Sequence, residues 1–167
     1  MYSVRLGFGT AKSRIRKLMT NGHHAEALLT SVFTFEKIIH RTLKQLIVSA
    51  GFRNADADLL LKQFRGFKKQ KDIWSCFDPS GRSLPAIIGN THWQRVNSAV
   101  EMRNRLVHGT QTYRLDKCRE MTENILELLD QTVDAFRAMY GYDGWARVAV
   151  RHKATLHSDP KVILPNA

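Results

Sequence analysis

The chain has 167 residues, of which 43% are hydrophobic and 25% charged, which is typical of a globular domain with one core and excludes wholesale disorder. Lysine and arginine number 26 against 15 aspartate and glutamate, so the formal net charge is +11. This excess favours an anionic partner, with nucleic acid first and an acidic protein second.

Membrane and secreted classes are disfavoured. No apolar run reaches the roughly 18 residues that a membrane-spanning helix needs, and the N-terminal stretch MYSVRLGFGTAKSR lacks the apolar core of a secretory signal. Cys76 and Cys118 match neither a metal site nor a disulfide framework, and Cys118 falls on an apolar helix face, where a buried reduced thiol is expected. We therefore expect a cytoplasmic protein with no membrane partner, no cofactor and no metal ion.

The N-terminal half contains a long helix. Residues 1–10 are predicted to form an irregular lead, followed by a short basic helix over about residues 11–20. Asn21 and Gly22 break the chain. Apolar residues then recur three and four positions apart, which predicts a helix over about residues 23–50.

The middle of the chain is rich in basic residues. Asn54 is expected to cap a helix over about residues 55–67, a further helical turn follows, and the stretch DPSGRSLP is expected to be a loop. The segment KQFRGFKKQK carries five basic residues, two phenylalanines and no acid. Two interpretations stay open. In the first, the phenylalanines stack on nucleic-acid bases while the basic side chains follow the phosphate backbone. In the second, the phenylalanines pack into the protein core and the lysines are solvated.

The C-terminal half is predicted to contain two more helices. One runs over about residues 92–108 with Thr91 as its N-cap, and the other begins after Thr110 or Thr112 and continues to about residue 139. The last helix has an apolar face and an acidic face, and the acidic face is expected to be mainly solvated. Beyond it, the stretch RVAV is expected to be either a short strand or an extended arm on the body.

These elements predict an all-α protein. We expect an antiparallel helical bundle of four to five helices, two of them long, with an irregular C-terminal tail. The expected division is a helical domain over residues 1–140, including its basic lead, and a basic extension over residues 141–167 that packs on the domain or trails from it.

A charge lies in the centre of an apolar helix face. At about 100° per residue, Arg103 falls in the middle of the apolar face of the helix over residues 92–108. Burying a lone charge costs roughly several kcal/mol, so a partner is needed. One interpretation is an ion pair with Glu36, which also interrupts an apolar series. The other is a cleft or subunit interface in which the guanidinium donates two hydrogen bonds to a phosphate.

Two polar residues accompany this arginine. Asn104 and His108 are four positions apart and so share a helix face beside Arg103. Gly109 is expected to end the helix, which lets His108 project from a terminus. Since the unperturbed pKa of histidine lies near neutrality, this side chain is a candidate general acid or base.

The segment RNRLVH, from Arg103 to His108, resembles the signature of HEPN domains: an arginine, a polar residue that is often asparagine, a short spacer, and a histidine near a helix end. The order of helices over residues 23–140 is similar as well. The resemblance implies a metal-independent endoribonuclease, often a toxin or defence effector. It also implies a homodimer whose two motif helices line one cleft, and an antitoxin protein as a further partner.

The resemblance also implies roles for four residues. Arg103 would hold the scissile phosphate of RNA, and His108 would be the acid/base for attack by the ribose 2′-oxygen. Asn104 would orient His108 or the phosphate, and Glu36 would add the acidic residue that some members carry. Two alternatives stay open: a non-catalytic nucleic-acid-binding module, and a protein-interaction domain in which Arg103 is buried against Glu36.

Overall fold

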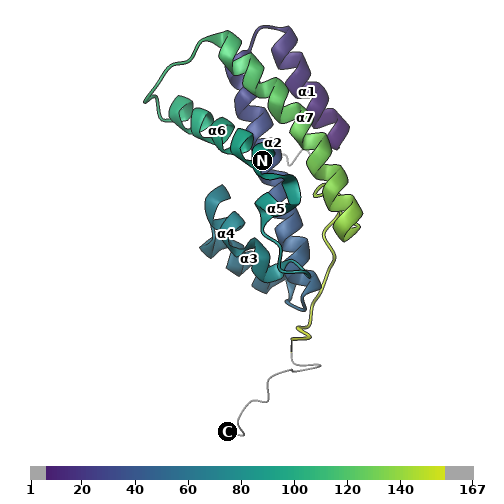
Figure 1. The fold of residues 1–167 in the computed structure, drawn as a ribbon. Coiled ribbons are helices and arrows are strands. Elements are labelled where there is room, and N and C mark those ends of the chain that lie inside the picture. Colours follow the sequence, from purple (N-terminus) through teal and green to yellow (C-terminus); the bar gives the residue numbers. More distant parts are fainter. Residues whose placement is uncertain (1–6, 157–167) are drawn as a thin grey trace, which may run out of the picture.

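The computed structural model describes residues 7–156 of the chain. Within this range the backbone forms seven α-helices and no strand, which confirms the predicted all-α class. In chain order the helices are α1 (Phe8–Thr20), α2 (His24–Ser49), α3 (Asn54–Gln63), α4 (Phe67–Phe77), α5 (Leu84–Ile88), α6 (Asn90–Val107) and α7 (Leu115–Tyr140) (Figure 1).

The described residues contain more helices than the four to five that we predicted. The segment predicted as one helix with a further turn divides into α3 and α4, because Gly66 between them has a φ of 89°, which no helix accommodates. The short α5 begins inside the expected loop, where Ser83 accepts a hydrogen bond from the backbone N–H of Ala86 and Pro85 lies in the first turn.

Several predicted helix starts are shifted. α1 begins at Phe8 rather than near residue 11, and residues 1–6 of the predicted irregular lead lie outside the described residues. α3 begins at Asn54 itself, so Asn54 is not the N-cap. α6 begins one residue before Thr91, and α7 begins only after Arg114. Capping residues in the sequence therefore predicted where helices occur, but the predicted first residue was wrong by one to several positions.

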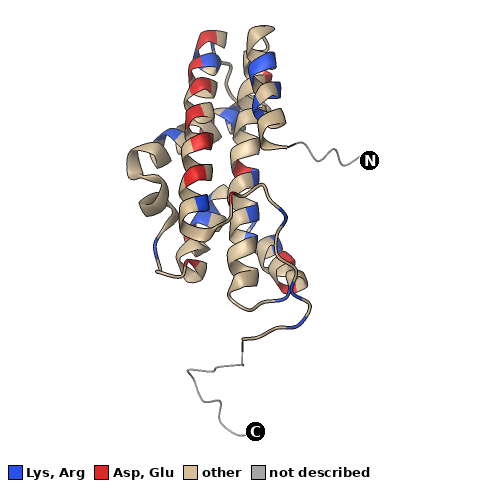
Figure 2. Cartoon of the chain, turned by 90° about the vertical axis from the view of Figure 1, so that its right-hand side faces the viewer, with Lys and Arg blue, Asp and Glu red and all other residues tan. Residues whose placement is uncertain are grey.

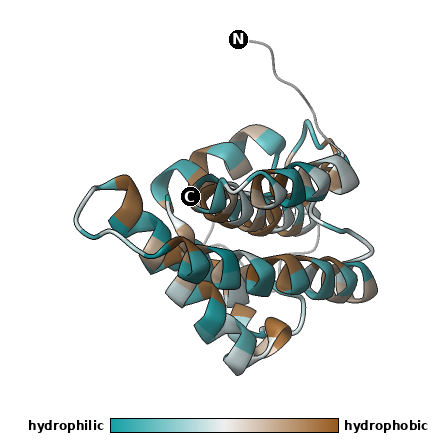
Figure 3. Cartoon of the chain, turned by 90° about the horizontal axis from the view of Figure 1, so that it is seen from above, coloured by the Kyte–Doolittle hydropathy of each residue, from teal (hydrophilic) through white to brown (hydrophobic). Residues whose placement is uncertain are grey.

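Helix α2 lies at the centre of the fold. It contacts α1, α3, α4, α6 and α7, and thirteen of its 26 residues are buried. The equally long α7 packs along it. Viewed from above, hydrophobic residues gather on the facing sides of the helices and hydrophilic ones face outward (Figure 3). Some polar side chains of α2 bond to its own carbonyls, as Ser31 and Thr34 do, and others reach neighbouring elements.

The acidic face of α7 is mainly solvated, as expected. Figure 2 shows acidic residues following one side of this helix, with basic residues on neighbouring elements. Asp116, Glu123 and Asp134 are exposed. Asp130 differs, because it accepts hydrogen bonds from the Lys12 ammonium at 2.5 and 2.6 Å and so ties α1 to α7.

A buried carboxylate joins α4 to α7. Asp78 is 5% exposed and accepts hydrogen bonds from the Tyr140 hydroxyl at 2.6 Å, from the Arg82 guanidinium, and from the backbone N–H groups of Ser80 and Arg82. The Trp74 indole N–H donates to the Tyr140 hydroxyl at 3.3 Å. Burial alone would raise the pKa of Asp78, but these hydrogen bonds outweigh it and lower the pKa to about 2.

The Asp78 pKa shift makes stability dependent on acid pH. Since the pKa is lowered from its ordinary value of 3.8 to about 2, the folded state favours the ionised form, and the contribution is present above pH 3.8 and lost as the pH falls through 2. We expect Asp78→Asn to remove on the order of 2 kcal/mol of unfolding free energy at pH 7. Urea unfolding at pH 2–7 measures this. The exposed Asp134→Asn is the control, and equal effects of the two variants would contradict the assignment.

Residues 141–156, which we call the C-terminal arm, run along α2 and α3 without regular secondary structure (Figure 1). The Arg41 guanidinium donates to the backbone carbonyls of Gly144, Trp145 and Ala146. The Asn54 side chain donates to the Ala149 carbonyl and accepts from the Arg151 N–H. The stretch RVAV is therefore an extended arm on the body. Residues 157–167 of the predicted extension lie outside the described residues.

Gly144 fixes where the C-terminal arm meets α2. A Cβ added there would lie 2.7 Å from Ile38 Cγ2 and 2.9 Å from the Ile38 carbonyl oxygen, and φ is +75°. We expect Gly144→Ala to lower the unfolding free energy by roughly 1–3 kcal/mol, measured by thermal denaturation. Gly141→Ala is the matched control, because Gly141 also has a positive φ (+61°) but open space around its Cβ position. Equal losses of unfolding free energy in the two variants would show that the contact with Ile38 does not destabilise Gly144→Ala.

Candidate functional site

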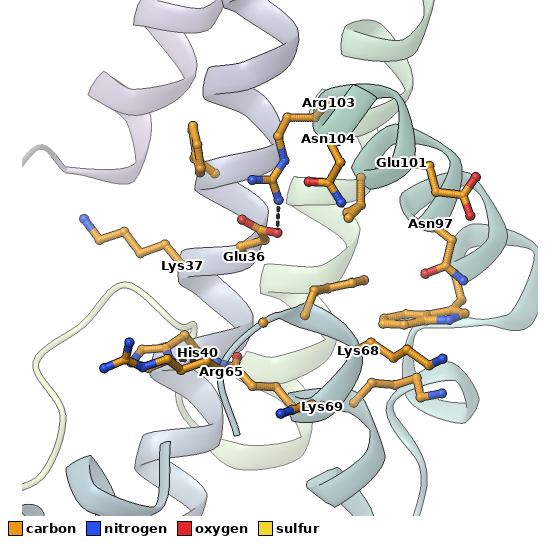
Figure 4. Close-up of a pocket in the computed structure, with 17 residues that line it drawn as sticks. Glu36, Lys37, His40, Arg65, Lys68, Lys69, Asn97, Glu101, Arg103 and Asn104 are labelled. Carbon is orange, nitrogen blue, oxygen red and sulfur yellow. Dashed lines mark hydrogen bonds and ion pairs between the residues drawn. The ribbon is translucent and has the colours of Figure 1, made fainter. Parts of the chain in front are cut away.

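A cleft of about 1080 Å³ opens between α2, the start of α4 and α6 (Figure 4). Its walls carry six basic and two acidic side chains. These are Lys37, Arg65, Lys68, Lys69, Lys71 and Arg103, with Glu36 and Glu101. Three elements distant in sequence therefore form one predominantly cationic hollow, which attracts an anionic ligand.

The start of α4 is unusually basic for a helix N-terminus. Its first turn contains Lys68 and Lys69 and no acidic residue, and no side chain caps it. Cations are unfavourable at this end of a helix, because the unpaired N–H groups already make it positive. Arg65, Lys68 and Lys69 are exposed and have no ion pair within residues 7–156. A bound anion would offset this unfavourable arrangement.

Arg103 and Glu36 form an ion pair at the wall of the cleft. The Arg103 guanidinium on α6 donates to Glu36 Oε1 on α2, and their side chains are 14% and 25% exposed (Figure 4). The guanidinium also lies 4.9 Å from the ring centre of Phe33. Arg103 Nε is buried and has no hydrogen-bond partner in the described part of the chain. The two features expected as alternatives, an ion pair and a cleft, thus occur together.

The carboxyl group of Glu36 is not fully stabilised by its partner. Burial raises the pKa of Glu36, while the charge and the hydrogen bond of Arg103 lower it by less, so that the net direction is upward. The ionised pair is therefore held at a cost in desolvation. An anion that competes for Arg103 would meet a carboxylate that accepts a proton more readily than usual.

The other two predicted site residues are placed differently. Asn104 lies beside Arg103 and lines the cleft. His108 is the C-cap residue of α6, is exposed, and does not line the cleft. The structure thus brings Glu36, Arg103 and Asn104 together and leaves His108 one turn beyond them. Within one chain, His108 is therefore not among the residues that line the cleft with Arg103.

A histidine that we did not predict lines the cleft instead. His40 lies one helical turn after Glu36 on α2, and its Nδ1 is 3.0 Å from the side-chain amide of Gln70, which is buried on α4. Burial lowers the pKa of His40, and Lys44 lowers it further. Because the Gln70 amide N–H donates to Nδ1, the neutral imidazole carries its proton on Nε2 and can donate a hydrogen bond from that atom. In the sequence, the only indication of this position was that His40 follows Glu36 by four residues, which places both side chains on one face of the helix.

The aromatic residues of the cleft are not platforms for bases. Phe67 and Trp93 stack on each other with ring centres 4.6 Å apart, and both are buried. Phe67 therefore packs inward beneath exposed lysines, and Phe64 is half-buried. The interpretation that the phenylalanines of KQFRGFKKQK stack on bases is wrong for Phe67, while the cations of this segment do border the cleft.

Within residues 7–156, no group of three or more histidine, cysteine, aspartate or glutamate side chains is arranged to hold a metal ion. None of the helices in the same range has the length and hydropathy to cross a bilayer. Comparisons of the chain with protein-family models, with curated proteins and with solved structures returned no match. The residues of the cleft therefore carry the functional argument.

The ion pair can be tested for a structural role by a double-mutant cycle. We expect Arg103→Met and Glu36→Leu each to lower the unfolding free energy by roughly 1–3 kcal/mol, because each leaves one half-buried charge unpaired. The double variant should return close to the wild-type value. Urea unfolding measures all three.

The exposed pair Arg119 and Glu123 on α7 is the control, and its single variants should change stability by less than about 0.5 kcal/mol. If the losses of the two single variants added in the Arg103→Met, Glu36→Leu double variant, the two charges would not be coupled, and Glu36 would not hold Arg103.

Proposed function

We propose that the chain is a metal-independent endoribonuclease of the HEPN type, built on a HEPN-like antiparallel helical bundle, that holds an RNA phosphate in the cleft. One observation carries the proposal. The uncapped, basic N-terminus of α4 and the Arg103 guanidinium on α6 line the same hollow. Both are anion-binding features, and a phosphodiester between them would be held from two sides.

RNA supplies its own nucleophile for this reaction. A base removes the proton of the ribose 2′-hydroxyl, the 2′-oxygen attacks the adjacent phosphorus, and the bond from phosphorus to the 5′-oxygen breaks. The 5′-oxygen takes up a proton, leaving a 2′,3′-cyclic phosphate and a 5′-hydroxyl end. The protein needs only to move protons and to stabilise charge on the phosphate. Histidine and arginine side chains suffice for these roles.

In this mechanism Arg103 releases the Glu36 carboxylate and binds an RNA phosphate. A phosphate that reaches the guanidinium competes with the Glu36 carboxylate for its N–H donors. Because burial raises the pKa of Glu36, the displaced carboxylate can take up a proton rather than remain charged beside the phosphate. Asn104, which lines the same wall, can donate a hydrogen bond to a phosphate oxygen.

The proton-transfer group has two candidates. His108, the residue implied by the resemblance, lies outside the cleft of its own chain, so it requires a second copy of the chain to bring it to the phosphate. His40 already lines the cleft, and it accepts a proton at Nδ1 only when the hydrogen bond from Gln70 is released. The homodimer is therefore part of the proposal if His108 acts, and is not needed if His40 acts alone.

Cleavage of RNA in the presence of EDTA tests the function. We expect activity with cyclic phosphate products, and Arg103→Ala should lower the single-turnover rate by about 10²–10³. A histidine that transfers the proton should lose about 10²–10⁴ when changed to alanine, so His40→Ala and His108→Ala are compared. His23→Ala is the control, because His23 is exposed at the start of α2, away from the cleft.

Mixing experiments separate the two histidines. If the site is shared across a dimer, a mixture of Arg103→Ala and His108→Ala chains should regain part of the activity that each lacks alone. Activity that disappears with chelator, or that survives in both His40→Ala and His108→Ala, would contradict the proposal.

A second candidate function is a non-catalytic RNA-binding module. The position of His108 outside the cleft and the existing ion pair of Arg103 favour it. This candidate expects strongly salt-dependent RNA binding without cleavage, and no effect of His108→Ala. An antitoxin partner remains an expectation from the resemblance, and a cytoplasmic location remains an expectation from the sequence composition.

A further inference from the structure

Three hollows meet at His40. Besides the cleft, a hollow of about 450 Å³ lies between α2, α3 and the start of α4, and one of about 430 Å³, which we call the arm hollow, lies between α2, α3 and the C-terminal arm. His40 lines all three, and Lys37 lines both the cleft and the arm hollow. The three hollows are therefore neighbours around His40, and the arm hollow lies on the side of the C-terminal arm.

The arm hollow is also predominantly basic. Four basic side chains line it, and Asp58 is its one acidic lining residue among the residues that the structure describes. The Asp58 carboxylate is already paired with the Lys44 ammonium at 2.6 Å. Arg147 is exposed and has no ion pair within residues 7–156. The basic surface thus extends well beyond the position where Arg103 would hold a phosphate.

The C-terminal arm holds Arg147 in place. Arg41 binds three consecutive carbonyls of the arm, and Gln45 accepts a hydrogen bond from the Ala149 N–H at 2.8 Å. Backbone on both sides of Arg147 is therefore fixed to α2. A cation that is already positioned loses less conformational entropy when it binds a phosphate.

We propose that single-stranded RNA bound in the cleft continues past His40 into the arm hollow, where Arg147 contacts one of its phosphates. This inference rests on the proposed function, because the cleft must first hold an RNA phosphate. Hollows of about 450 and 430 Å³ between helices have room for unpaired nucleotides, whereas a stiff duplex could contact only their rims. The substrate class is therefore an unpaired strand several nucleotides long.

Binding of uncleavable RNA tests this path. The probes are 2′-O-methyl RNA strands of about 3 and about 12 nucleotides, which lack the nucleophilic hydroxyl, and fluorescence anisotropy gives their affinities over a range of salt. For the long strand, Arg147→Glu should weaken binding about tenfold and lower the salt slope by at least about 0.7, since each phosphate contact in a single strand contributes about 0.7. Binding of the short strand should stay within about twofold.

Arg14→Glu on α1 is the matched control, because it makes the same charge change at an exposed position that lines neither the cleft nor the arm hollow. Circular dichroism confirms that both variants are folded. Equal losses in the two variants, or a duplex bound as tightly as the long single strand, would overturn the path. Failure of both strands to bind wild-type protein would instead refute the proposed function.

Discussion

The central position of α2, with thirteen of its 26 residues buried, is the constraint on which the rest of the structure depends. Five other helices contact it, and several of its polar side chains bind these neighbouring elements. Glu36 pairs with Arg103 on α6, His40 with Gln70 on α4, and Arg41 with the backbone of the C-terminal arm. Three polar residues within six positions of one helix thereby fix three neighbouring elements around the cleft.

The places where local rules of helix stability are broken coincide with the cleft. A charge in an apolar face, a carboxyl group with a raised pKa and lysines at a helix N-terminus are each unfavourable alone. Such conflicts are concentrated at functional sites in folded proteins, because binding rather than folding selects the residues. The buried network around Asp78, by contrast, satisfies its carboxylate fully and so stabilises the fold.

The net charge of +11 is distributed unevenly. Acidic residues gather on the outer face of α7 (Figure 2), while basic residues surround the cleft and the arm hollow on the other side of α2. An uneven field of this kind orients an approaching polyanion and guides it to the cationic side. The acidic face of α7 is paired with α1 through Lys12 and with its own basic residues, so it does not neutralise the cleft.

The sequence by itself determined the all-α class, the two long amphipathic helices, and the misfit of Glu36 and Arg103, because apolar periodicity is a local property of the chain. It did not predict the division between α3 and α4, which one positive φ at Gly66 imposes. Only the tertiary structure decided that His40 lines the cleft and that His108 does not. These positions depend on how α2, α4 and α6 pack against one another, and no pattern within a single helix encodes that packing.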